Sequence, residues 1–163
     1  MKKLLGFSIF LVFVLIASLT AEAKVTLPAI FSDNMVLQQN TQVNVWGKAA
    51  PGEKVTVKAS WLDKAVTAKA AANGKWTVKL KTPKATTNQS VTVSGENEIT
   101  INNVLIGEVW LCTGQSNMEF PVSRHPDVKW NTGMLNEAEE LKYADYPEIR
   151  LFHVKHQLAH EGE

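Results

Sequence analysis

The fold of this chain is decided by the stretch Asn73-Gly74-Lys75-Trp76-Thr77-Val78-Lys79-Leu80-Lys81. From Trp76 to Leu80, apolar residues alternate with polar ones, which is the two-residue period of a strand that buries one face. The Asn-Gly pair in front favours a tight hairpin turn, because both residues tolerate positive backbone dihedrals. We therefore predict a half-buried strand that begins directly after a turn.

The same alternation extends outward on both sides of this strand. Four further apolar pairs repeat it: Val43 and Val45, Val55 and Val57, Val91 and Val93, and Ile99 and Ile101. Turn signals separate the runs, notably Ala50-Pro51-Gly52-Glu53. Short strands at this spacing are typical of an antiparallel sandwich, so residues 24–104 are predicted to form a β-sandwich-like domain.

After Asn103 the rhythm changes. Val109-Trp110-Leu111-Cys112 is a continuous apolar run, which favours a strand buried on both faces of a parallel sheet. Apolar residues with helical spacing follow: Met134, Leu135, Ala138 and Leu141. Pro147 comes after them as a helix stop. Residues 149–154 resemble another strand. A strand, a turn, a helix and a second strand are the first elements of an α/β domain. We therefore predict that residues 105–163 form the first part of such a domain.

The N-terminus predicts export. Lys2 and Lys3 precede an apolar run over residues 4–19, and Ala21-Glu22-Ala23 offers small residues at a cleavage site, so residues 1–23 are interpreted as a signal peptide. The run is shorter than the roughly 20 apolar residues of a membrane-spanning helix, so no stable membrane anchor is expected. We expect a soluble mature protein that begins near Lys24 and is secreted or periplasmic.

The charge balance predicts no nucleic-acid partner. Without Lys2, Lys3 and Glu22 the chain has 15 basic and 15 acidic residues, and its sequence shows no basic stripe able to neutralise several phosphates. Cys112 is the only cysteine, so no intrachain disulfide can form and stability must come from packing.

The apolar run ends in Thr113-Gly114-Gln115-Ser116-Asn117, a turn suited to chemistry. In α/β proteins ligands bind outside the carboxyl ends of the strands, which is where this turn would lie. Gly114 would permit a sharp turn and a close approach of substrate, and the Ser116 amide would donate to an oxyanion. A serine nucleophile also needs a histidine base. The alternative on local pattern is a turn serine that hydrogen-bonds its own backbone.

Several separated stretches between Val25 and Phe152 belong together: Phe31-Ser32-Asp33-Asn34-Met35-Val36-Leu37-Gln38, Val45-Trp46-Gly47, Pro51-Gly52-Glu53, Gly107-Glu108-Val109-Trp110-Leu111-Cys112-Thr113-Gly114-Gln115-Ser116-Asn117-Met118-Glu119 and Pro147-Glu148-Ile149-Arg150-Leu151-Phe152. In this order they resemble the sialate O-acetylesterases, which belong to the SGNH hydrolase superfamily. A set of motifs in one order is more specific than the pentapeptide around Ser116.

The resemblance implies a β-sandwich-like region followed by a flavodoxin-like catalytic domain. It implies removal of acetyl groups from sialic acids, or from another acetylated sugar, by a serine mechanism without metal or other cofactor. Ser116 matches the family's nucleophile. The family also uses an oxyanion-hole glycine and asparagine and a late Asp-x-x-His. None of these can be placed here, since no aspartate has a histidine three positions later. We expect an incomplete, inactive version of the enzyme.

Four histidines are candidates for a substitute base or for metal ligands: His125, His153, His156 and His160. A base needs both reach and an orienting partner, and no local pattern supplies them. A helical metal site conflicts with the strand-like residues 149–154, and no zinc motif is present. A solvated tail is the favoured interpretation of the last three.

Other conspicuous residues have structural interpretations. Trp46 and Trp76 are predicted to pack in the sandwich, with a sugar-stacking platform as the alternative. Cys112 is predicted to be a buried strand residue. For Arg124 and Arg150 a surface or structural role is the favoured interpretation, and binding of a sialate carboxylate is the alternative. For the whole protein, the alternatives are a non-catalytic carbohydrate-binding or scaffold module and an acetyl esterase for plant polysaccharide.

Overall fold

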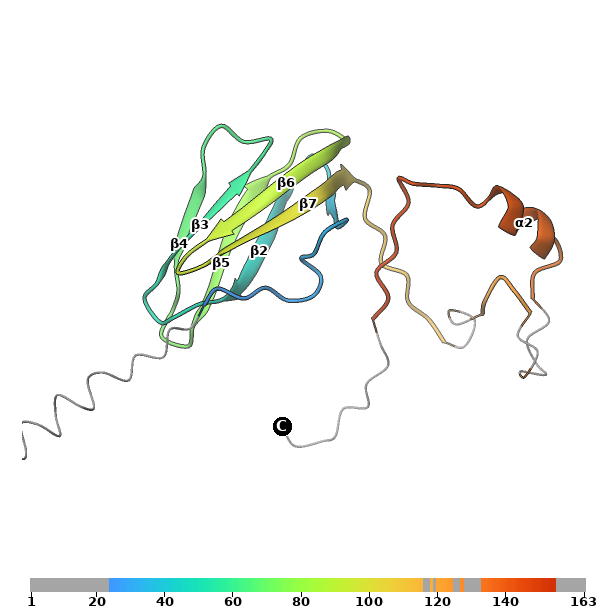
Figure 1. The fold of residues 1–163 in the computed structure, drawn as a ribbon, viewed down its shortest axis with the longest axis horizontal. Helices are drawn as coiled ribbons and strands as arrows, with labels where there is room; N and C mark the ends of the chain where they lie inside the picture. Colours follow the sequence, from blue (N-terminus) through green and yellow to red (C-terminus); the bar gives the residue numbers. More distant parts are fainter. Residues whose placement is uncertain (1–23, 116–117, 119, 125–126, 128–132, 155–163) are drawn as a thin grey trace, which may run out of the picture.

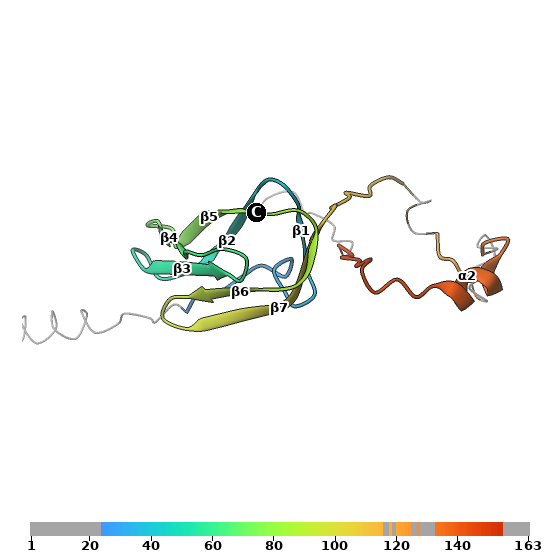
Figure 2. The same cartoon turned by 90° about the horizontal axis from the view of Figure 1, so that it is seen from above.

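The molecule is mostly β, with two sheets that pack face to face (Figures 1 and 2). The computed structural model describes residues 24–115, 118, 120–124, 127 and 133–154. The described part contains these strands and helix: β1 (Val36–Gln38), β2 (Gln42–Lys48), β3 (Lys54–Ala59), β4 (Val66–Lys69), β5 (Lys75–Lys81), β6 (Thr86–Ser94), β7 (Glu98–Gly107) and α2 (Glu137–Tyr143).

The larger sheet has the strand order β1-β7-β6-β3-β4, and β2 and β5 form a separate pair. In Figure 2 the β2–β5 pair is one layer and β3, β6 and β7 are the other, while the edge strands β1 and β4 curl toward the pair. The five strands predicted from apolar alternation are all present. The antiparallel prediction needs one correction, because β1 runs parallel to β7. Three residues are enough for such an edge pairing, and β1 is too short to show alternation.

The core lies between the two layers. Alternate residues of both sheets are buried, and the most enclosed are Val45, Val55, Val57, Leu80, Val91, Val93, Ile101 and Val104. Their burial is the main favourable term for this part of the fold. Trp76 packs in the core at 3% exposure, as predicted. Trp46 lies on the opposite face of the β2–β5 pair and is 44% exposed. The prediction that it packs in the sandwich is therefore met only in part.

Both predicted turns exist, but one of them connects different elements than expected. At Ala50–Glu53 the Glu53 amide donates to the Ala50 carbonyl at 3.0 Å, and Gly52 has a φ of 82°. At Asn73-Gly74, Gly74 has a φ of 74° and its amide donates to the Ala71 carbonyl at 2.8 Å. The flanking strands β4 and β5 belong to different sheets, so this turn carries the chain between layers and does not close a hairpin.

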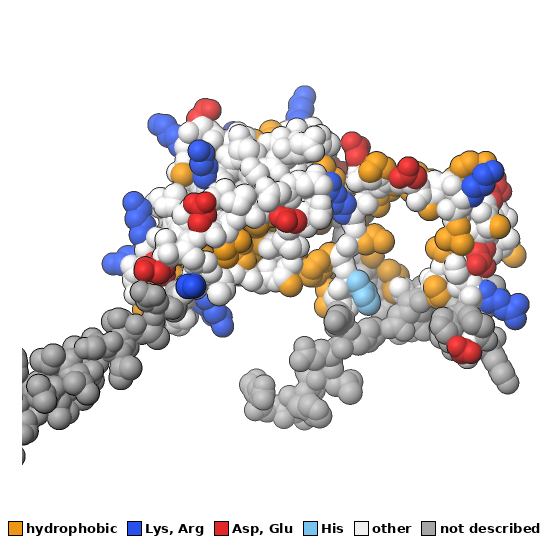
Figure 3. All heavy atoms as spheres, viewed as in Figure 1, with side chains coloured by type: hydrophobic (Ala, Val, Ile, Leu, Met, Phe, Trp, Pro, Cys, Tyr) orange, Lys and Arg blue, Asp and Glu red, His pale blue; other side chains and the backbone are white. Residues whose placement is uncertain are grey.

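The second half of the chain corrects the α/β prediction. Residues 109–112 and 149–154 are not strands, and no α/β domain is visible among the described residues. Leu111 is 91% exposed and Leu151 94%, and Figure 3 shows hydrophobic side chains at the surface of the segment around α2. A strand needs a hydrogen-bonding neighbour and a covered face, and within the described residues these two runs have neither.

The predicted helix is present as α2, although no residue of it is buried. Within the described residues, no helix is long and apolar enough to cross a membrane. The predicted signal peptide, residues 1–23, lies outside the described residues.

Candidate active-site turn

The approach to the candidate turn is fixed where the chain leaves β7. Gly107 pairs with Gln38 at the end of β1. The Glu108 carboxylate accepts hydrogen bonds from the side-chain amides of Gln38 at 3.0 Å and Gln39 at 2.7 Å. The Gln38 side-chain oxygen in turn accepts from the Val109 amide at 2.8 Å. We call the side chains of Gln38, Gln39 and Glu108, together with the Val109 amide, the glutamine clasp. They tie residues 108–109 to a segment about 70 positions earlier.

The clasp favours a charged Glu108. The hydrogen bond from Gln38, and then that from Gln39, lowers the pKa of the Glu108 carboxyl below its usual value. An ionised carboxylate accepts at both oxygens, and bonds to a charged acceptor are stronger than neutral ones. The clasp is therefore intact at neutral pH.

A second set of polar contacts joins two of the sequence stretches that carry the family resemblance, residues 31–38 and 147–152, to the middle of β7. Asp33 accepts from the Asn102 amide at 2.7 Å, and Asn34 accepts from the Asn103 side chain at 2.8 Å. The Arg150 guanidinium donates to the backbone carbonyl of Asn103 and, at 3.1 Å, to its side-chain oxygen. These bonds tie residues 33–34 and Arg150 to β7. The structural role predicted for Arg150 is confirmed.

The turn itself is described only up to Gln115. Ser116 and Asn117, the predicted nucleophile and its neighbour, lie outside the described residues. On either side of them the Met118 amide donates to the Gln115 carbonyl at 2.9 Å. A Cβ atom on Gly114 would lie 2.8 Å from Cγ of Met118. Gly114 is not among the residues with positive φ, so its small size matters here because of the approach of Met118.

Cys112 requires a correction, because its side chain is exposed and not buried in a strand. The same holds for its neighbours, with Val109 at 52% and Trp110 at 83% exposure. The prediction assumed a sheet around the apolar run, and the described residues provide no such sheet. An exposed cysteine beside the turn is open to solvent-borne reagents.

The remaining candidates are not brought together. His153 is exposed, and His125, His156 and His160 lie outside the described residues. No cluster of three metal-ligating side chains exists within the described ranges. The Arg124 amide donates to Glu137 at 3.2 Å, which connects residues 122–124 to α2.

The sequence predictions missed the clasp residues Gln38, Gln39 and Glu108. Their only local signal is position, since the two glutamines end one apolar run and Glu108 precedes another. Nothing in the local pattern reveals that the two positions meet.

Comparison with known proteins confirms the resemblance to sialate O-acetylesterases. No protein-family model matches the sequence. The chain is 30% identical over 138 residues to the sialate O-acetylesterase of Mus musculus, which covers 77% of this chain and 24% of the mouse protein. It is 30% identical over 145 residues to the sialate O-acetylesterase of Rattus norvegicus, covering 82% of this chain and 25% of the rat protein.

A solved structure gives the same relation. The chain matches the crystal structure of a carbohydrate acetylesterase from Xanthomonas citri with a TM-score of 0.58 and 36% sequence identity, over 64% of this chain and 24% of that one. The chain thus spans about a quarter of the length of the relatives it matches.

Proposed function

We propose that this chain provides the β-sandwich and the nucleophile-bearing turn of a carbohydrate O-acetylesterase, with Ser116 as the nucleophile. The observation that carries the proposal is the match in sequence and fold to the Xanthomonas citri carbohydrate acetylesterase. The glutamine clasp supports it, because catalysis needs a well-placed nucleophile and the clasp anchors residues 108–109, where the segment that leads to Ser116 leaves the sandwich.

The proposed chemistry is acyl transfer. The Ser116 hydroxyl attacks the acetyl carbonyl and gives its proton to a histidine base, the bond between the acetyl carbon and the sugar oxygen breaks, and the sugar leaves with that proton. Water then hydrolyses the acetyl-serine to acetate. Because the 163 residues hold no Asp-x-x-His, the proposal assigns the base and its carboxylate to the remaining three quarters of the relatives' length.

The proposed substrate is an O-acetylated sialic acid. The names of the mouse and rat proteins support this choice, whereas the name of the Xanthomonas citri enzyme specifies only a carbohydrate. An acetylated plant polysaccharide is the second candidate, since the serine machinery does not depend on which sugar bears the acetyl group.

We also propose that the protein is exported and that residues 1–23 are removed. Cleavage after Ala23, at the small-x-small pattern Ala21-Glu22-Ala23, would leave Lys24 at the N-terminus. Intact-mass analysis of secreted protein tests this, and a secreted product that keeps residues 4–19 would contradict it.

The decisive experiment is a chimera that joins residues 24–152 to the complementary part of the Xanthomonas citri enzyme. Acetate release is measured on O-acetylated sialic acid and on acetylated xylan. Ser116→Ala should lower kcat by about 10⁴-fold, whereas Cys112→Ala, a matched change four positions away, should have little effect. Retained turnover in Ser116→Ala overturns the mechanism, and a clear preference for xylan overturns the sialate assignment.

The 163-residue chain alone should show no turnover near the usual enzyme range of about 1 per second or more, because it lacks the base and the full oxyanion hole. Acetate release from an activated acetyl ester by the purified chain measures this. Turnover in that range would mean that one of its own histidines serves as the base.

A further inference from the structure

The outer face of the β2–β5 pair is basic. Register and burial place eight exposed residues on it: Gln42, Asn44, Trp46, Lys48, Lys75, Thr77, Lys79 and Lys81. We call this set the lysine face. It contains four lysines and no aspartate or glutamate, although the sequence had shown no basic stripe. Strand alternation separates these lysines in the sequence and gathers them on one surface, so the linear sequence does not reveal the face.

The lysines repel one another without compensation. Lys48 lies directly opposite Lys75 in the antiparallel register, an arrangement of like charges that destabilises a strand pair. Within the part of the chain that the structure describes, no carboxylate lies within salt-bridge distance of the four ammonium groups on the face. An anion bound here would relieve the repulsion.

Trp46 gives the face an apolar platform. The residue is 44% exposed, and its ring makes an edge-to-face contact with Phe31, with the centroids 4.6 Å apart and the planes at 78°. Phe31 itself is 8% exposed and belongs to the core. A ring fixed in this way can pack against the C–H face of a pyranose without losing much conformational entropy on binding.

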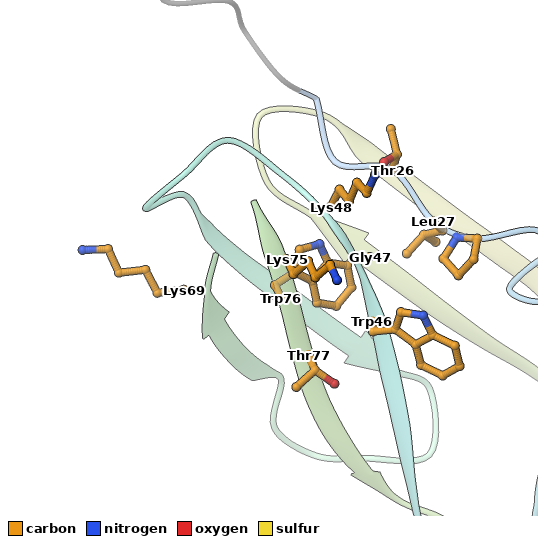
Figure 4. Close-up of a pocket in the computed structure, with 10 residues that line it drawn as sticks. Thr26, Leu27, Trp46, Gly47, Lys48, Lys69, Lys75, Trp76 and Thr77 are labelled. Carbon is orange, nitrogen blue, oxygen red and sulfur yellow. The ribbon is translucent and has the colours of Figure 1, made fainter. Parts of the chain in front are cut away.

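A pocket adjoins the platform. It has a volume of about 810 Å³, within the range of small-molecule sites, and Leu27, Trp46, Lys48, Lys75 and Thr77 contribute to its lining. Figure 4 shows Leu27, Trp46 and Lys48 together at the edge of β2. An aromatic wall beside two ammonium groups matches a sugar ring that carries a carboxylate.

We propose that the lysine face binds an acidic saccharide. One sugar ring stacks on Trp46 with its carboxylate between Lys48 and Lys75, and further acidic units follow Lys79 and Lys81 along β5. Charge-assisted hydrogen bonds to carboxylates and apolar contact with the indole supply the binding free energy. The choice of a saccharide over other polyanions rests on the proposed function.

The face leads toward the candidate turn. The β2–β5 ladder runs from the Lys48–Lys75 pair to the Gln42–Lys81 pair, a span of about 20 Å at the usual rise per residue. Beyond Lys81, the Thr82 hydroxyl donates to the Gln38 carbonyl at 2.8 Å, and Gln38 belongs to the glutamine clasp. The lysine face is therefore a binding site separate from Ser116 that would hold an acidic chain near the segment leading to the esterase turn.

The test uses the 163-residue chain in affinity electrophoresis with polygalacturonate, with the same polymer after its carboxylates have been reduced to alcohols, and with polysialic acid. The charged polymers should retard the protein and the reduced polymer should not. The two charged polymers identify whether uronic or sialic units are preferred. Trp46→Ala and the double variant Lys75→Gln/Lys79→Gln should each weaken retardation by about tenfold.

The control is Lys54→Gln/Lys58→Gln, which removes the same charge from exposed positions of β3 and should leave retardation unchanged. Thermal melting verifies that each variant is folded, and Trp46→Phe should retain part of the affinity if Trp46→Ala is unstable. Absence of retardation, equal retardation by the reduced polymer, an equal loss in the control, or tighter binding of single-stranded DNA overturns the proposal. Ser116→Ala should bind normally, so binding and the esterase proposal fail independently.

Discussion

Similar apolar side chains are buried in the sandwich of residues 24–107 and exposed in the described part of residues 108–154. Leu80 in β5 has no exposed surface, whereas Leu111 and Leu151 are more than 90% exposed. The difference is not in hydrophobicity but in partners, because β5 has a paired strand and a facing sheet, and the described part of the second segment has neither. An apolar run is buried only where its backbone is also satisfied.

Within the described residues, polar contacts tie the two regions together. The glutamine clasp holds residues 108–109, and Arg150 binds Asn103 of β7. Exposed hydrogen bonds of this kind contribute much less to stability than a buried core does. The comparison therefore predicts a steep difference in stability between the regions.

The largest expected effect is in hydrogen exchange. Amides of β6, which lies between β3 and β7, are expected to open only with the whole sandwich, whereas Trp110, Leu111 and Cys112 lie in no strand or helix. Their exchange should be faster by at least about 10³-fold. Exchange followed by NMR or mass spectrometry measures this, and comparable protection in the two sets would mean that residues 110–112 are packed in solution.

A matched pair of leucine truncations should separate the regions next. Leu80→Ala removes a fully buried side chain and should lower the free energy of unfolding by about 2–5 kcal/mol. Leu151→Ala removes an exposed one and should change it by no more than about 0.5 kcal/mol. Urea denaturation gives both values, and an equal loss would break the comparison.

Substitution of two glycines compares the stability of a turn within the sandwich with that of the position where the chain leaves it. Gly74 has a φ of 74°, and an added Cβ would lie 2.8 Å from the Ala49 carbonyl oxygen, so Gly74→Ala should destabilise by about 1–2 kcal/mol. Gly107 has no atom within 4 Å of an added Cβ, so Gly107→Ala should be close to neutral. Thermal melting of the two variants decides, and a neutral Gly74→Ala would show that this turn can relax.

The smallest effect concerns the clasp. Because hydrogen bonds lower the pKa of Glu108 in the folded protein, its contribution is present at neutral pH and is lost as the pH falls through that lowered value. NMR signals of the Gln38 and Gln39 side-chain amides should titrate with a midpoint below the usual glutamate value of about 4.3. In Glu108→Gln this titration should disappear, and a midpoint at or above the usual value would argue against the clasp.

Some features of the molecule follow from the sequence alone. The alternation around Trp76-Thr77-Val78-Lys79-Leu80 predicted a strand, its buried face and the turn before it, and the helical spacing after Met134 predicted α2. These signals are local, since the two-residue and 3.6-residue periods depend only on where side chains point along one element. The turn around Ser116 stays a prediction from its residues, since Ser116 lies outside the described residues.

Other features were decided only by the tertiary structure. The glutamine clasp joins positions about 70 residues apart, the lysine face depends on the register of β2 with β5, and Cys112 is exposed because no strand of the described part of the chain pairs with residues 109–112. Pairing between distant strands sets all three, and no local period encodes which strands will meet. Apolar alternation therefore identified the strands, while the sheet topology determined which polar side chains came together.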